Sequence, residues 1–169
     1  GVAPAGASIP TIHMGRHGGN MDHNDVAPGT VVYLPVFVAG GLLSVGDVHA
    51  SMGDGETTGG GIDIPAEVTI GVSLLKGCSI CRPILELEGH VVTTANGPEF
   101  FGAAEIAIRE MADLLRRKLG VDWEEALQLV SARGDLLCGQ TARGPFDLTL
   151  RCKFPRLWEG PLFRSTEEA

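Results

Sequence analysis

The chain has 169 residues and a formal net charge of −8, from 13 basic and 21 acidic side chains. This excess of acid excludes a surface that wraps nucleic acid, because phosphate binding needs clustered cations. Hydrophobic residues make up 44% of the sequence, and no apolar run reaches the length of about 18 residues that a membrane-spanning helix requires. Residues 1–169 are therefore interpreted as a single globular unit, with no nucleic acid and no membrane among its partners.

Four segments in the first part of the chain have the composition of β-strands. Residues 30–38 are β-branched and aromatic, and Pro35 within them favours an edge strand or a bulge. Residues 66–75 alternate apolar and polar positions, which predicts a half-buried strand. Two shorter strands are expected at 83–88 and 90–94.

Two helices are predicted next. Apolar residues recur every three or four positions from Glu99 to Leu119, and Gly120 ends the run. A second helix is expected at 123–133, because Asp122 and the glutamate three residues later have the pattern of a capping box.

A last strand is predicted at 147–154, where apolar and polar side chains alternate strictly. Its polar face, expected to be wet, carries Thr149, Arg151 and Lys153. The chain shows no repeated alternation of strand and helix, so we expect an α+β fold. Its mostly antiparallel sheet would be sandwich-like or barrel-like, with a two-helix insertion near residues 99–133.

The cysteines bear on the compartment. Four cysteines in a chain of this size do not form the dense disulfide framework of a small secreted domain, and free thiols are expected. The sequence shows no charged segment followed by an apolar one, as a secretory signal would have. We therefore expect a cytoplasmic location. The single Cys78–Cys81 pair has no second CxxC, which favours reduced thiols over structural zinc.

The segment 13–63 is unusual in its charge. It contains six carboxylates and four imidazoles but only one basic residue, Arg16. So many acids would repel one another if they were brought together, and a bound metal ion is a natural counter-charge. The segment is therefore a candidate metal site.

Spacing within this segment adds detail. Asp47 and His49 are two residues apart, which puts them on the same face of an extended backbone, and Asp54 and Glu56 repeat that spacing. The short stretch between the two pairs can turn the chain and let them converge. For either pair alone, the alternative is a solvated loop or a capping group.

The string GRHGGNMDHNDVAPGTVVYLPVFVAGGLLSVGDVHASMGDGE at residues 15–56 resembles the signature of the acetamidase/formamidase family. The resemblance continues more loosely through the helices to Asp135 and Gly139-Gln140. Members of that family are substantially longer, so the chain resembles their C-terminal part. The run TTGGGID that follows Glu56 is richer in glycine than the family pattern.

The resemblance implies hydrolysis of a short aliphatic carboxamide, such as formamide or acetamide, to a carboxylate and ammonia by a metal-activated water. A divalent ion, zinc or calcium, is the expected cofactor. In this interpretation Asp47, His49 and Asp22 are the metal ligands, Glu56 is the base or proton carrier with Asp54 supporting it, and Asn20 binds the substrate amide.

The expected partners are the small amide substrate and further polypeptide, either as a homo-oligomer or as an associated upstream N-terminal chain. The alternative from another class is a non-catalytic fragment or subunit, which keeps the fold and holds a purely structural cation.

Overall fold

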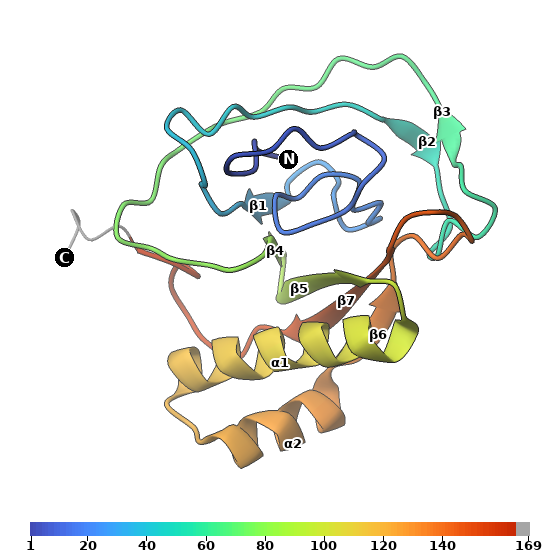
Figure 1. Ribbon diagram of the computed structural model, residues 1–169. Coiled ribbons are helices and arrows are strands. Elements are labelled where there is room, and N and C mark those ends of the chain that lie inside the picture. Colours follow the sequence, from blue (N-terminus) through green and yellow to red (C-terminus); the bar gives the residue numbers. More distant parts are fainter. Residues whose placement is uncertain (165–169) are drawn as a thin grey trace.

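The computed structural model describes residues 1–164 as a five-stranded antiparallel sheet with helices on one face and loops on the other (Figure 1). The strand order is β1-β4-β5-β7-β6. These strands are β1 (Val31–Tyr33), β4 (Ile84–Leu87), β5 (His90–Gly97), β6 (Asp135–Cys138) and β7 (Leu148–Pro155). The loop layer, formed by residues 1–30 and 34–82, contains a small ribbon of β2 (His49–Ser51) and β3 (Ile62–Asp63).

This arrangement confirms the predicted α+β fold with a mostly antiparallel sheet. Within residues 1–164 neither sheet closes on itself, so a barrel is not formed. The strands predicted at 83–88 and 90–94 are present as β4 and β5, and they form a hairpin whose turn uses Gly89 at φ +70°. β1 lies at a sheet edge, as Pro35 predicted, but it ends before Pro35, because proline has no N–H for the ladder.

Both predicted helices are confirmed as α1 (Phe100–Leu119) and α2 (Trp123–Arg133). Gly120 ends α1 in the left-handed conformation, and its N–H donates to the carbonyl of Arg116. The Asp122 carboxylate accepts from the Glu125 N–H at 2.8 Å, and the Glu125 carboxylate accepts from the Asp122 N–H at 3.1 Å. This capping box satisfies donors at the start of α2.

The hydrophobic core lies between the helices and the sheet. α1 buries mostly small residues against β5 and β7, including Ala103 and Ala107, which lets the helix approach the strands closely. Thr93 on β5 donates from Oγ1 to the carbonyl of Ala107 at 2.8 Å. From β7 the core takes Leu150, Cys152 and Phe154, so one face of the predicted alternation is confirmed.

The opposite face of β7 corrects a prediction. Thr149 and Arg151 were expected to face solvent, yet Arg151 is only 2% exposed. The loop layer covers this face, and Arg151 forms ion pairs with Asp25 at 2.7 Å and Asp54 at 2.6 Å. Polar residues alternate here because they bind the loop layer and not because they meet water.

Residues 66–75 give a second correction. The segment is extended, but it belongs to no strand, and its apolar side chains are exposed, with Val72 at 76%. Alternation of apolar and polar residues shows that an extended segment has two different faces. A β-strand also needs a neighbouring strand with which its backbone can pair. Within residues 1–164 this segment has no such neighbour.

Two simpler expectations concern the helices and the thiols. Neither α1 nor α2, the helices of residues 1–164, is long and apolar enough to cross a membrane. All four cysteines are free thiols, as predicted.

Candidate active site

The ribbon of β2 and β3 builds an acidic cluster around one histidine. Pairing of the two strands sets His49 opposite Asp63. The Nε2 atom of His49 lies 3.0 Å from a carboxylate oxygen of Asp63 and 3.5 Å from one of Asp47. One potential ligand atom from each residue lies within 4.8 Å of the other two. Two carboxylate oxygens and an imidazole nitrogen so arranged fit a single divalent cation.

Asp47 and His49 are therefore brought together as the sequence predicted, and Asp63 is a member of the cluster that sequence reasoning missed. The available signal was its place at the end of the glycine-rich run at 57–63. No larger residue fits at Gly61 in that run, because a Cβ there would lie 2.8 Å from Cγ of His49 and 3.1 Å from the carbonyl oxygen of Ser51. The glycine leaves room for the imidazole ring beside the residue that precedes β3.

A second group of acids gathers around Gln140. Its Nε2 atom donates to the Glu56 carboxylate at 2.7 Å and to the Asp22 carboxylate at 3.1 Å. Both Glu56 and Gln140 are buried, each 6% exposed. The Oε1 atom of Gln140 is also buried and has no partner within residues 1–164. A buried acceptor without a partner is costly, so this atom calls for a donor that the described residues do not supply.

The backbone around Gln140 explains its position. Gln140 follows β6, and its N–H donates to Oγ1 of Thr149 on β7 at 2.6 Å. The next residue, Thr141, donates from its N–H to the carbonyl of Gly55 at 2.7 Å. These bonds tie the end of the sheet to the loop that carries Glu56. The contacts of Gln140 could not be predicted, because nothing local in the sequence shows that it meets residues more than 80 positions away.

The environment of Asp22 shifts its protonation. The pKa of this carboxyl is raised to about 6, mainly by burial and also by the carboxylates of Glu56 and Asp47, while His49 partly opposes the rise. Asp22 therefore interacts electrostatically with members of both groups. A carboxyl group whose pKa is near 6 can both take up and release a proton close to neutral pH. Asp22 is not among the three residues that cluster as metal ligands.

Asp54 and Asn20 have different surroundings. The Asp54 carboxylate accepts from Arg151 at 2.6 Å and from Asn24 at 2.8 Å. Burial alone would raise the pKa of Asp54, but these hydrogen bonds outweigh it and hold the pKa below its ordinary value. Asn20 donates from Nδ2 to the carbonyl of Ile12 at 3.0 Å, which holds the start of the loop layer. Their supporting and substrate-binding roles stay predictions.

The backbone of the site is itself unusual. Four site residues have positive φ angles although none is glycine: Asn20 at 47°, Asp22 at 46°, Asp47 at 59° and Glu56 at 39°. Only a few per cent of non-glycine residues adopt this conformation, and such strained positions cluster at functional sites.

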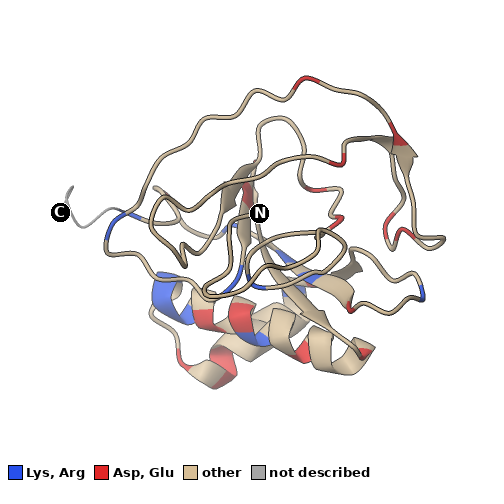
Figure 2. Cartoon of the chain, turned by 45° about the horizontal axis from the view of Figure 1, so that its top comes forward, with Lys and Arg blue, Asp and Glu red and all other residues tan. Residues whose placement is uncertain are grey.

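Charge is divided between the layers of the molecule. Figure 2 shows carboxylates spread along the loop layer, where the basic residues are few (Arg16, Lys76 and Arg82), while the helices carry both acidic and basic residues. Two cations of β7 reach the layer from below: Arg151 pairs with Asp25 and Asp54, and Lys153 pairs with Asp25. The Asp47–His49–Asp63 cluster contains two acids and no Lys or Arg, which suits a bound cation.

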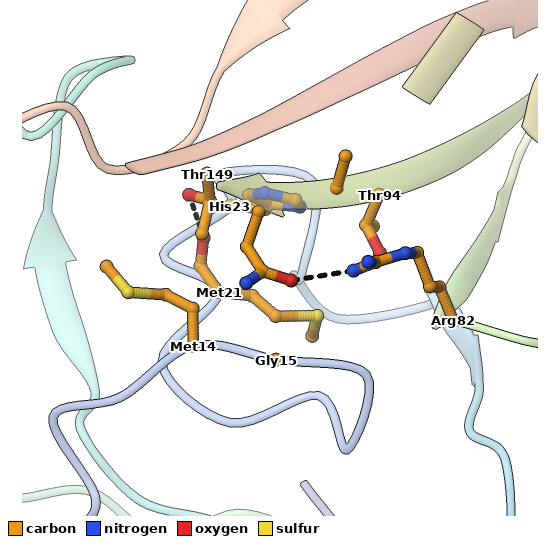
Figure 3. A pocket seen from close by; sticks show the side chains of 9 residues that line it. Met14, Gly15, Met21, His23, Arg82, Thr94 and Thr149 are labelled. Carbon is orange, nitrogen blue, oxygen red and sulfur yellow. Dashed lines mark hydrogen bonds between the residues drawn. The ribbon is translucent and has the colours of Figure 1, made fainter. Parts of the chain in front are cut away.

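A small cavity lies beside the site, under the loop layer (Figure 3). Met14, Met21, His23 and Thr149 line one part of it, and Arg82 closes it with a hydrogen bond to Asn96 at 2.6 Å. Its volume of about 10 Å³ has room for about one water molecule and not for an amide. Both ring nitrogens of His23 are buried without a partner in residues 1–164. Burial lowers the pKa of this histidine to about 3, so the ring is neutral at pH 7.

Comparison with known proteins defines the class. A model of the Acetamidase/Formamidase family matches residues 2–133, and the chain belongs to this family. A formamidase from Methylophilus methylotrophus is 48% identical over 67 residues, which are 39% of this chain and 16% of that protein. An acetamidase from Mycolicibacterium smegmatis is 40% identical over 68 residues, or 40% of this chain and 17% of that protein.

Solved structures agree with this assignment. The crystal structure of an acetamidase from Bacillus halodurans is 39% identical, with a TM-score of 0.85, over 92% of this chain and 52% of that chain. An acetamidase from Yersinia enterocolitica is 32% identical, with a TM-score of 0.87, over 91% of this chain and 46% of that chain. The chain thus spans about half the length of these solved relatives.

Proposed function

We propose that the protein containing this chain hydrolyses a short aliphatic carboxamide, of the formamide or acetamide type, to the carboxylate and ammonia. Family membership and the names of the relatives support the reaction class. The observation that carries the proposal is the pair of carboxyl groups, Asp22 and Glu56, beside the Asp47–His49–Asp63 cluster.

The second part of the proposal concerns the metal. A donor set that includes imidazole favours zinc over calcium, because calcium takes six to eight oxygen ligands. Asp47, His49 and Asp63 would hold the ion. When bound, a zinc ion would polarise the amide carbonyl and lower the pKa of water to about 7.

The carboxyl pair would move the proton. Water adds to the carbonyl carbon, forming a C–O bond, and its proton passes to Asp22, whose pKa of about 6 leaves it mostly ionised at neutral pH. As the C–O bond forms, the π electrons of the carbonyl move onto its oxygen. Glu56 shares Gln140 with Asp22 and is our candidate to receive the proton from Asp22 and deliver it to the nitrogen. The C–N bond then breaks as the C=O bond re-forms, and its electron pair leaves with ammonia. The free Oε1 of Gln140 would accept a hydrogen bond from the substrate NH₂ group.

The test is ammonia release from formamide and acetamide by the natural protein, with bound metal measured on the same samples. Asp47→Ala, His49→Ala and Asp63→Ala should each lose metal and ammonia release together. Asp113→Asn, which alters an exposed carboxylate on α1, is the matched control and should change neither. Metal content and ammonia release that both survive in the cluster variants would overturn the assignment.

The carboxyl pair has its own test. The Glu56→Gln variant removes a negative charge near Asp22, so the pKa of Asp22 should fall from about 6 toward its ordinary value of 3.8. Loss of a positioned proton carrier should slow ammonia release by about 10²–10⁴-fold. Carboxyl titration followed by NMR measures the first effect, and an unmoved Asp22 would show that the two groups do not act as a pair.

A structural cation is the second candidate. His49 and Asp63 are cross-strand partners, so an ion bound to both would also hold β2 against β3. In that case chelation should lower the melting temperature and leave turnover per folded molecule unchanged. The cytoplasmic location and a homo-oligomeric state stay predictions of the sequence.

A further inference from the structure

Two neighbouring segments of the loop layer expose an apolar surface. Every residue in 42–47 and in 62–74 is exposed. The segments are joined at the ribbon of β2 and β3, where the Ile64 N–H donates to the carbonyl of Val48 at 3.0 Å, and they run across the top of the layer (Figure 1). We call this the apolar ribbon; its large side chains are Leu42, Leu43, Val45, Ile62, Ile64, Val68, Ile70, Val72 and Leu74.

The part at 66–75 has the properties of a strand without a partner. On its extended backbone Val68, Ile70, Val72 and Leu74 share one face, and they are between 51% and 76% exposed. The opposite face is polar, with Glu67, Thr69 and Ser73. Within residues 1–164 the backbone of 65–75 makes no hydrogen bond to other backbone groups. A long, apolar, unpaired edge of this kind is a template for another strand.

The solved relatives indicate what covers it. They match more than nine-tenths of this chain at TM-scores of 0.85 and 0.87, so the chain has the conformation of the corresponding half of those proteins. About half of each relative lies outside the match. That other half of each relative has no counterpart within residues 1–169.

We propose that residues 66–75 pair as a β-strand with a polypeptide that carries the remaining part of the family fold. The contacting strand would have apolar residues at alternate positions, to meet Val68, Ile70 and Val72, and a free backbone edge. This inference does not rest on the proposed amidase activity.

The pairing would also bear on the acidic cluster. β3 has only two residues, Ile62 and Asp63, and both are exposed. From Asp63 the chain continues into the rest of the apolar ribbon, which includes residues 66–74. A partner strand would therefore fix the backbone that carries Asp63, and the cluster would be held from both sides.

The experiment uses the protein as its own cell makes it. The chain is tagged at its locus, purified without denaturation, and analysed by intact mass, peptide sequencing and hydrogen exchange. We expect polypeptide from the remaining part of the family fold, joined to the chain or bound to it. Amides of 66–75 should exchange at least 100-fold more slowly than those of the exposed loop at 57–60. Equal exchange of the two segments, or protection in an assembly that contains only copies of this chain, would overturn the proposal.

Matched variants test the face. Ile70→Lys combined with Val72→Lys should abolish the protection of 66–75, whereas Thr69→Lys combined with Ser73→Lys, on the polar face, should keep it. Far-UV circular dichroism checks that α1 and α2 persist in both proteins. Retained protection in the first variant, or equal loss in both, would overturn the assignment of the apolar face as the contact.

Discussion

The buried histidine of the small cavity makes stability depend on pH in a calculable way. Burial holds the pKa of His23 at about 3 in the folded protein, and Arg151 acts in the same direction, while Asp25 and Asp54 partly oppose it. In the unfolded chain the ordinary value is 6.5. Between these values the unfolded state binds a proton that the folded state does not, so stability is complete above pH 6.5 and is lost as the pH falls.

The magnitude follows from the same pair of values. A pH of 5 lies about 1.5 units below the pKa of the histidine in the unfolded chain. This difference corresponds to a loss of about 2 kcal/mol in the free energy of unfolding. This figure hardly changes if the folded pKa is 4 and not 3, because the folded ring is neutral at pH 5 in either case. Asp22 acts in the opposite direction, since a raised carboxyl pKa favours the folded state as the pH falls.

The assay must therefore separate the two groups. Urea unfolding of the wild type and of His23→Gln at pH 7, 6 and 5 does so, because Asp22 is present in both proteins. The wild type should lose about 2 kcal/mol more than the variant between pH 7 and 5. Parallel pH profiles would show that His23 is protonated in the folded protein, and the reasoning from its burial would be wrong.

Further substitutions test other contacts. Gly61→Ala should displace His49 and reduce the amount of bound metal. Gly60→Ala, whose Cβ would meet nothing within 4 Å, should leave the bound metal unchanged. Metal analysis of the two variants measures the difference. Gly139→Ala would press a methyl group onto Thr149 and His23 and should cost about 3 kcal/mol. Gly102→Ala, in open space on α1, should stabilise by about 0.5–1 kcal/mol; thermal unfolding distinguishes these opposite signs. Arg151→Met leaves Asp25 with Lys153 as its remaining cation and removes the cation of Asp54, and it should cost about 3 kcal/mol by denaturant unfolding. A loss below about 1 kcal/mol would contradict a tightly held set of ion pairs.

The sequence predicted those parts of the fold that depend on neighbouring residues. The capping box at Asp122, the stop at Gly120 and the hairpin turn at Gly89 are local signals, and each is confirmed. The wet face of β7 was predicted wrongly, because a polar side chain such as Arg151 alternates in the same way whether it meets water or Asp25.

The candidate site shows the same division. Asp47 and His49 share a short motif and were found from spacing, whereas Asp63 joins them only through the pairing of β2 with β3. Gln140 reaches Glu56 across 84 positions of sequence, which no spacing rule covers. Residues 66–75 carry the alternating pattern of a strand but form none within residues 1–164, because alternation does not supply a neighbouring strand.

The left-handed backbone of the site has a consequence for protein engineering. At Asp22, Asp47 and Glu56 a glycine would adopt the same φ angle without the cost of about 1 kcal/mol that an L side chain incurs. A screen for heat resistance should therefore enrich glycine first at the exposed Asp47, because the carboxylates of Asp22 and Glu56 also accept hydrogen bonds from Gln140. A position where glycine raises thermal stability but lowers activity would be one whose side chain serves the chemistry and not the folding of the protein.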